Sequence, residues 1–305
     1  MCGIVGYIGH QRALPIVVEG LKRLEYRGYD SAGVAVLATE RIDITRAVGR
    51  ISNLESKLGN EPNEAAATAT VAIAHTRWAT HGGPSEVNAH PHASWNGRIA
   101  LVHNGIIENY RAIATFLDRH GIQCVSETDT EVLAHLVAHC YRDSLEQAVR
   151  DALHDVQGTY GIAVISLDDP DCIVVARKGS PLILGVGNGE YLVASDAAAI
   201  VKHTTQVVYL SDGEMAVVNR NGFRTTTLDA VPVTKDLHEV EFSLDEIELG
   251  GHEHFMAKEI FEQPQSLANT LRGRLNTREG AIVLGGIAGY ARDLARARRI
   301  IFTAQ

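Results

Sequence analysis

The chain opens with Met1-Cys2-Gly3-Ile4-Val5-Gly6, and this stretch decides how the rest of the sequence is interpreted. If Met1 is removed, which the small side chain of Cys2 should permit, Cys2 carries a thiol and a free α-amine together. A model α-amine titrates near pH ~8 and a free thiol near ~8.5, so the amine can accept the thiol proton without a histidine. Ile4-Val5 begins an apolar run that predicts a buried strand. The alternative is that Met1-Cys2 is only a translation start.

Composition narrows the class of protein. The 305 residues are 45% hydrophobic, enough for one large core or two smaller ones. A formal net charge of −9 argues against a nucleic-acid or anionic-membrane surface. The sequence contains no apolar run of about 18 residues and no signal-peptide pattern, which predicts a cytoplasmic protein without membrane partners. Its four cysteines show no C-x-x-C spacing, so no disulfide framework is expected.

The spacing of apolar residues predicts helices in the first half of the chain and hairpins in the second. From Tyr160 onward, period-two apolar runs alternate with turn sequences, as in antiparallel hairpins. The polar, alanine-rich stretch up to about Thr70 carries no assigned element. Helices early and hairpins late predict an α+β sandwich of sheets and helices. The other predicted elements are helices over 12–24, 106–120 and 255–271, the last interrupted at Pro264, and strands over 34–37, 71–74, 99–102 and from Ile300.

Two of these strands lead into polar stretches. Residues 75–83 read His-Thr-Arg-Trp-Ala-Thr-His-Gly-Gly, and residues 103–105 read His-Asn-Gly. Both are predicted as loops at strand ends, where a rigid strand positions a chemically active segment. Thr128-Asp129-Thr130-Glu131 is predicted as the capping box of a further helix, which places Asp129 in the first helical turn.

These polar residues suit an N-terminal thiol that attacks a carbonyl carbon. The resulting oxyanion needs two donors, which the Asn104 side-chain amide and the Gly105 backbone N–H could supply. Arg77 could pair with a carboxylate and Asp129 with an ammonium group. Asp129 could instead only complement the helix dipole. A carboxylate, an ammonium and an attackable amide together describe glutamine or asparagine.

The sequence resembles the class II glutamine amidotransferases. Within that class it resembles the glutamine–fructose-6-phosphate aminotransferases, because the phosphoribosyl-diphosphate amidotransferases typically have Gln-His-Arg-Gly in place of Glu25-Tyr26-Arg27-Gly28 and tyrosine in place of Trp78. The asparagine synthetases lack this arginine-tryptophan loop. The motifs that carry the resemblance lie at residues 1–6, 25–33, 75–82, 103–109, 128–131 and 252–260.

The resemblance implies an N-terminal nucleophile (Ntn) hydrolase fold, an αββα sandwich of two antiparallel sheets between helical layers. It implies that the Cys2 thiol is the nucleophile and its α-amine the acid and base, and that no cofactor is needed. The resemblance further assigns the oxyanion hole to Asn104 and Gly105, and the binding of L-glutamine to Arg77 and Asp129. It implies that a mobile loop with Trp78, Thr80 and His81 covers the bound glutamine and gates an ammonia channel. Arg27 is implied as a supporting residue. No metal site is expected either, since the histidine pairs at 90 and 92 and at 252 and 254 lack a third ligand with matching spacing.

The resemblance also implies a domain division. Residues 1–228 are predicted as the glutaminase domain, 229–280 as a connector, and 281–305 as the start of a truncated sugar-isomerase domain. In the full-length enzymes, two such domains bind fructose 6-phosphate and the protein is a homodimer. Two alternatives stay open: an amidotransferase domain that serves another acceptor, and a glutamine-binding module without catalysis if Met1 is retained.

Overall fold

Two antiparallel sheets form the centre of the first of two compact units, Met1–Ile247. The computed structural model describes residues 2–60, 64–240, 251–271, 275–276, 280–282 and 290–301. One sheet contains, in spatial order, β15 (His238–Glu239), β11 (Gln206–Tyr209), β9 (Ile183–Val186), β10 (Tyr191–Ala194), β1 (Gly3–Ile8), β4 (Val71–Arg77), β2 (Ser31–Leu37) and β3 (Ile42–Val48). The other contains β14 (Pro232–Val233), β13 (Gly222–Thr227), β12 (Glu214–Asn219), β8 (Cys172–Lys178), β7 (Gly158–Ser166), β6 (Ile99–Ile107) and β5 (His92–Ala93).

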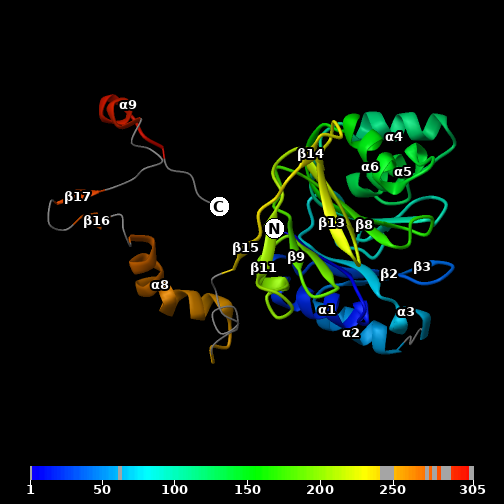
Figure 1. The fold of residues 1–305 in the computed structure, drawn as a ribbon, viewed down its shortest axis with the longest axis horizontal. Helices are drawn as coiled ribbons and strands as arrows, with labels where there is room; N and C mark the ends of the chain where they lie inside the picture. The colour runs from blue at the N-terminus through cyan, green and yellow to red at the C-terminus, as the bar shows by residue number, and fades with distance from the viewer. Residues whose placement is uncertain are drawn as a thin grey trace. The chain divides into compact units, whose positions relative to one another are not determined.

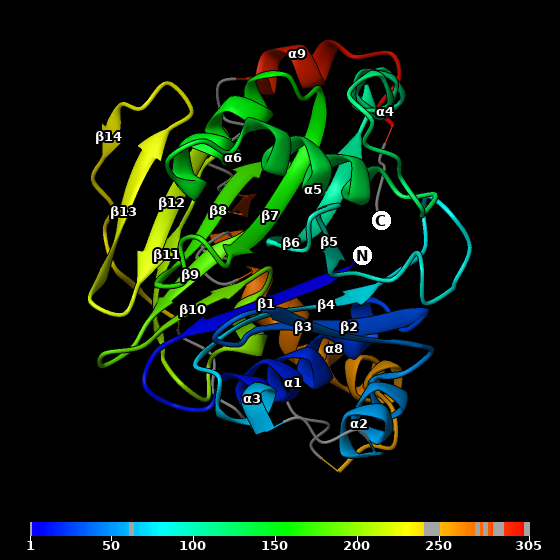
Figure 2. The same ribbon diagram turned by 90° about the vertical axis from the view of Figure 1, so that its right-hand side faces the viewer.

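Helices cover the outer face of each sheet, as Figures 1 and 2 show. The first sheet packs against α1 (Ala13–Leu24), α2 (Ile51–Asn60) and α3 (Glu64–Thr68), and the second against α4 (Tyr110–Arg119), α5 (Asp129–Cys140) and α6 (Leu145–His154). Two short 3₁₀ helices, η1 (Glu25–Arg27) and η2 (Ala197–Ala199), lie in loops of the same unit. The four layers confirm the predicted α+β sandwich.

Three apolar cores hold these layers together, one between the sheets and one under each helical layer. Successive side chains of a strand point to opposite faces, so a strand in the middle of the sandwich is buried on both. In β1, Ile4 belongs to the core between the sheets and Val5 to the core under α1. Every residue of β1 is buried. The apolar run that follows Cys2 is therefore the buried strand that the sequence predicts.

The polar ends of two strands were wrongly expected to be loops. β4 extends to Arg77 and β6 to Ile107, so residues 75–77 and 103–105 belong to strands, and the helix expected from residue 106 begins only at Tyr110. The strands continue because the polar side chains find partners in the interior. For example, the hydroxyl of Thr76 donates a hydrogen bond to the backbone carbonyl of Gly28.

The alanine-rich stretch before Thr70 contains β3, α2 and α3, which the sequence analysis did not assign. β3 pairs with β2 over its whole length, from Leu37 with Ile42 to Ser31 with Val48. It is an edge strand, and most of its side chains are only half-buried. Its apolar residues Ile42 and Ile44 are separated from Ala47 and Val48 by Thr45-Arg46, so it lacks the unbroken apolar pattern that revealed the other strands.

The second unit, Glu248–Gln305, contains α8 (Phe255–Leu271), the short pair β16 (Leu275–Asn276) and β17 (Ala281–Ile282), and α9 (Ala291–Arg296). α8 was expected to be interrupted at Pro264 but continues through it, since the missing N–H removes only one helical hydrogen bond. Ile300 and Ile301 form no strand, contrary to expectation, and the rest of that predicted strand lies outside the described residues. Among the described helices, none is long and apolar enough to cross a membrane.

Of the five histidines that are buried in the described part of the first unit, four lie close together, at positions 75, 90, 92 and 103. The rings of His75 and His90 lie at a tilt of 33° with centroids 4.2 Å apart, and that of His92 lies 5.1 Å from His90. His92 and His103 make hydrogen bonds of 3.0 Å with the hydroxyls of Thr128 and Thr130. Burial lowers the pKa of all four, to about 3 for His75. They are therefore neutral at physiological pH.

We expect the free energy of unfolding to decrease as the pH falls below about 6.5, the ordinary histidine pKa. Below that pH the unfolded chain takes up protons that the folded chain excludes, so each buried histidine contributes a slope of up to ~1.4 kcal/mol per pH unit. Urea unfolding between pH 7.5 and 5 tests this, because carboxylates titrate mainly below that range. A free energy of unfolding that stays constant over this range would contradict the neutral state of the histidines.

Candidate active site

Cys2 lies at the start of β1, beside the end of β4. The register pairs Gly3 with Thr76, which brings Cys2 next to the residues that follow Thr76. The backbone N–H of Trp78 donates to Cys2 Sγ over 3.2 Å, and the thiol lies 3.5 Å from the Trp78 carbonyl oxygen. Ser195 holds the strand from the other side, since its hydroxyl accepts from the Ile4 N–H over 3.0 Å. The thiol is thus placed by backbone contacts.

The surroundings of Cys2 keep its thiol protonated in the resting protein. Burial raises the pKa of Cys2, and the hydrogen bond from the Trp78 N–H opposes this increase only in part. A protonated thiol is a weak nucleophile, so a base must remove its proton when the reaction occurs. Such a base must lie within reach of Sγ, as an α-amine on the same residue would.

Asn104 and Gly105 lie near the end of β6. The Asn104 amide nitrogen, Nδ2, donates to the backbone carbonyl of Cys2 over 3.2 Å, which joins the two sheets at this point. Gly105 has a backbone φ of +136°, and a Cβ atom there would lie 2.1 Å from the carbonyl oxygen of Thr159. Only glycine fits this position. The two predicted oxyanion donors therefore lie on a strand beside the backbone of Cys2.

Arg77 is the last residue of β4 and is almost completely buried. Its Nη2 donates to the backbone carbonyls of His81 and, over 3.2 Å, Gly82, and so holds the loop that follows Trp78. Nη1 is buried and has no hydrogen-bond partner within the described part of the chain. Burial lowers the pKa of Arg77, while the nearby Cys2 and Asp129 raise it. An arginine side chain stays charged in proteins, so Nη1 is a charged donor that lacks a partner among the residues that the structure describes.

Asp129 begins α5, as the capping box predicts. Thr128 is the N-cap, and its hydroxyl accepts from the Glu131 N–H over 3.3 Å. The prediction was wrong for the second hydrogen bond of the capping box. The Glu131 carboxylate accepts from the N–H groups of Val125 and Ser126 and not from the N–H of Thr128. Asp129 Oδ2 accepts from the Ile107 N–H over 2.8 Å. Asp129 therefore links α5 to the end of β6, just beyond the predicted oxyanion hole.

The loop after β4 carries Trp78, Thr80 and His81. Trp78 is 47% exposed and packs edge-on against Tyr29, with ring centroids 5.8 Å apart. Thr80 is exposed. The ring of His81 packs edge-on against Tyr110 at 5.5 Å. The exposed indole and hydroxyl leave this loop accessible to solvent above the thiol.

Arg27, the predicted supporting residue, forms an ion pair with Asp196, with 2.6 Å between Nη1 and Oδ2. The next residue, Gly28, packs so closely on β4 that a Cβ atom would lie 2.9 Å from the Arg77 carbonyl carbon. The ion pair thus holds the segment that supports the end of β4. Among the bonds that the structure describes, neither residue of this ion pair contacts the thiol.

Sequence reasoning missed four residues that hold the site: His75, Asp30, Ser195 and Asp196. His75 Nε2 lies 3.0 Å from Asn104 Oδ1, and Asp30 Oδ2 accepts from the Ala79 N–H over 2.9 Å. Both lie in stretches that the sequence analysis singled out, so their polarity was the available signal. Ser195 and Asp196 follow β10 and contact residues more than 160 positions earlier, a proximity that no local pattern reveals.

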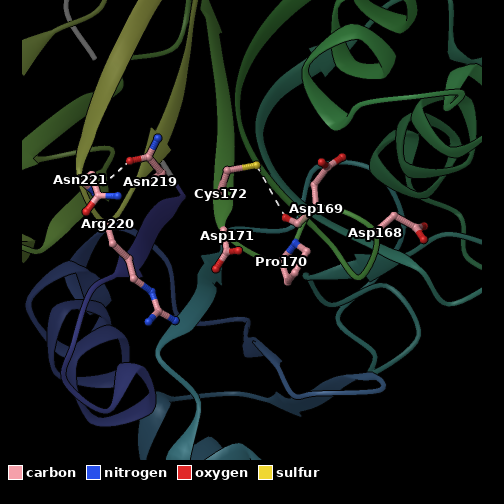
Figure 3. A pocket seen from close by; sticks show the side chains of 8 residues that line it. All are labelled: Asp168, Asp169, Pro170, Asp171, Cys172, Asn219, Arg220 and Asn221. Atoms are coloured by element: carbon pink, nitrogen blue, oxygen red, sulfur yellow. Dashed lines mark hydrogen bonds between the residues drawn. The ribbon is translucent and has the colours of Figure 1, made fainter.

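A pocket of about 690 Å³ lies elsewhere on the first unit. Figure 3 shows its lining residues, which come from the β7–β8 and β12–β13 turns and include Asp168 and Asp169. Both carboxylates are already engaged, Asp168 with Arg98 and Asp169 with the Tyr141 hydroxyl over 2.9 Å. None of the predicted site residues lines this pocket.

A family model described as a glutamine amidotransferase domain matches residues 38–239. The glutamine–fructose-6-phosphate aminotransferase (isomerizing) of Chlorobaculum tepidum is 54% identical over 308 residues, which cover 100% of this chain and 50% of that protein. The protein of the same name from Symbiobacterium thermophilum is 47% identical over 304 residues, with 100% and 49% coverage. The chain spans about half the length of the curated relatives it matches, and that half is the amino-terminal one.

Among solved structures, the chain is similar to the glutamine phosphoribosylpyrophosphate amidotransferase from B. subtilis complexed with ADP and GMP. The TM-score is 0.63 at 28% identity, and the match covers 74% of this chain and 49% of that one. The two antiparallel sheets between helical layers are thus those of an Ntn hydrolase, which confirms the expected fold class.

Proposed function

The chain belongs to the glutamine amidotransferase family and is homologous to the glutaminase half of glutamine–fructose-6-phosphate aminotransferase, and we therefore propose that it hydrolyses L-glutamine to glutamate and ammonia. One observation carries the proposal. The Asn104 amide donates to the Cys2 backbone carbonyl, and the Cys2 thiol lies near a buried arginine, Arg77, whose Nη1 has no hydrogen-bond partner among the described residues. A nucleophile, an oxyanion donor and an anion site converge where the two sheets meet.

In the proposed reaction, Met1 has been removed and the α-amine of Cys2 takes the thiol proton. The sulfur forms a bond to the γ-carbonyl carbon of glutamine, and the carbonyl oxygen becomes an oxyanion. Asn104 Nδ2 and the Gly105 N–H donate to this oxygen, and each such donor contributes about 10²–10³ in rate. The carbon–nitrogen bond then breaks as the ammonium group of Cys2 protonates the leaving ammonia. Water, deprotonated by the amine, attacks the thioester, and the carbon–sulfur bond breaks to release glutamate.

The amino-acid end of glutamine is held by two opposite charges. The open Nη1 of Arg77 binds the α-carboxylate, and Asp129 binds the α-ammonium group. Arg77 and Asp129 lie close enough to influence each other electrostatically, which supports a ligand of amino-acid size between them. The thiol lies near the same arginine, so the γ-amide extends toward Sγ.

The loop that carries Trp78, Thr80 and His81 closes over bound glutamine and holds it against the thiol. The 47% exposure of Trp78 supports this role, since the indole is free to move from its contact with Tyr29. Trp78 then separates the glutamine site from the path of the ammonia. Arg27 supports the loop base through its ion pair with Asp196.

The ammonia serves fructose 6-phosphate in glucosamine-6-phosphate synthesis, carried out by sugar-isomerase domains in the half of the relatives that this chain does not cover. Residues 1–228 form the glutaminase domain, 229–280 the connector and 281–305 the start of the first isomerase domain. The full-length protein is a cytoplasmic homodimer. The identity of 54% over the whole chain to an aminotransferase of this name supports the assignment of the acceptor.

Replacing the nucleophile tests the activity itself. In protein whose mass shows that Met1 is absent, Cys2→Ala should reduce ammonia release more than about 10³-fold, since loss of a nucleophile in other hydrolases costs about 10⁶. Calorimetry should still detect glutamine binding, because the anchoring residues remain. Turnover retained by Cys2→Ala, or glutamine binding by the wild type without any turnover, would contradict the proposal.

The carboxylate site can be tested with a modified substrate. L-Glutaminamide has a neutral amide in place of the α-carboxylate, so the wild type should prefer glutamine in kcat/KM by about 10- to 100-fold, the value of a charged hydrogen bond of ~1.5–3 kcal/mol. Arg77→Ala should remove most of this preference. The ratio of kcat/KM for the two substrates is the quantity to measure. General damage to the loop that Arg77 holds would lower both values alike and leave their ratio unchanged.

Arg98→Ala is the control, because Arg98 directly precedes β6 and its guanidinium pairs with Asp168, which is not one of the predicted site residues. It should keep the full preference for glutamine. A preference that survives in Arg77→Ala, or that disappears equally in Arg98→Ala, would exclude Arg77 from the carboxylate site.

A further inference from the structure

The Asn104 side chain makes two hydrogen bonds that fix which way its amide points. Nδ2 donates to the Cys2 carbonyl over 3.2 Å, and Oδ1 lies 3.0 Å from Nε2 of His75 on β4. An amide has nearly the same shape at both ends, so its orientation depends on the groups that it faces. The nitrogen carries two hydrogens, and one of them is left for a further acceptor.

The protonation state of His75 follows from its neighbours. Nε2 also lies 3.1 Å from the backbone carbonyl of His103, which can only accept a hydrogen bond. Nε2 therefore carries the proton. Nδ1 is buried and has no hydrogen-bond partner in the described residues, and burial lowers the pKa of His75 to about 3. His75 is thus neutral, with its single proton on the nitrogen that faces Asn104.

This proton orients the amide. If the Asn104 amide flipped, Nδ2 would face the Nε2–H of His75 and Oδ1 would face the Cys2 carbonyl. A donor would then face a donor and an acceptor would face an acceptor, which is unfavourable because the groups are buried. The ring of His75 itself packs against the ring of His90, with centroids 4.2 Å apart. The imidazole is therefore a fixed donor inside the sandwich.

We propose that His75 is a positioning residue that holds Asn104 with Nδ2 toward the backbone carbonyl of Cys2, so that the second amide hydrogen meets the oxyanion of the substrate. The inference rests on the proposed glutaminase reaction. His75 contacts neither the substrate nor the thiol in this assignment and acts only through Asn104. Its contribution is limited to the rate that Asn104 provides, about 10²–10³.

Two substitutions of His75 that both introduce a side-chain amide distinguish the positioning of Asn104 from the mere filling of a buried position. His75→Gln places an amide nitrogen near the position of Nε2, whereas His75→Asn places it near Nδ1, too far from Asn104. We expect His75→Gln to keep kcat within about 3-fold of wild type and His75→Asn to lower it about 10- to 100-fold. KM for glutamine should change little in both, because the residues that anchor glutamine are untouched.

A double-mutant cycle gives the decisive comparison. In an Asn104→Ala background, His75→Asn should lower kcat no further, since the group that it positions is already gone. Alkylation of Cys2 by iodoacetamide, which needs no oxyanion hole, should proceed at the wild-type rate in folded variants. His135→Asn is the matched control, a buried histidine on α5 whose described contacts do not include Asn104, and it should keep wild-type kcat.

Equal losses in His75→Gln and His75→Asn, or additive losses in the cycle, would overturn the positioning role while leaving the glutaminase function intact. A wild-type chain without turnover would overturn both. If either variant fails to fold, the tautomer of His75 in the wild type can be read from its imidazole ¹⁵N resonances. A proton on Nε2 is expected, and a proton on Nδ1 alone would overturn the proposal.

Discussion

The pairing of β1 with β4 is the constraint on which the site depends. It places the first residues of the chain in the middle of a sheet that is buried on both faces, so the position of Cys2 is set by backbone hydrogen bonds. The same pairing brings Arg77 and Trp78, at the end of β4, beside the thiol. Chain ends are usually poorly ordered unless they are tied into a sheet. Here the pairing of β1 with β4 fixes the position of Cys2.

The polar residues of the site are held by other polar residues inside the sandwich. Asn104 lies between the Cys2 carbonyl and His75, and Asp129 is held by the Ile107 N–H. Burial of such groups is costly unless each finds a partner, and a fully satisfied network is rigid. The neutral histidines supply donors and acceptors without adding positive charge near Arg77.

Much of the fold followed from the sequence because its signals are local. The period-two runs after Tyr160, the helix over 12–24 and the N-cap at Thr128 each depend on neighbouring residues. The edge strand β3 and the extension of β6 to Ile107 did not follow, because they depend on strand pairing and interior hydrogen bonds. For the same reason the candidate residues Cys2, Arg77 and Asn104 could be named, whereas the contacts that hold them could not.

The central claim is that Cys2 is a nucleophile specific for glutamine. Incubation with 6-diazo-5-oxo-L-norleucine, a reactive glutamine analogue, followed by intact-mass and peptide mass spectrometry, tests it most directly. We expect one label per chain, on Cys2, in molecules that lack Met1, and protection by L-glutamine. A chain that lacks Met1 and remains unlabelled, or that is labelled at Cys124, Cys140 or Cys172 instead, would contradict the account.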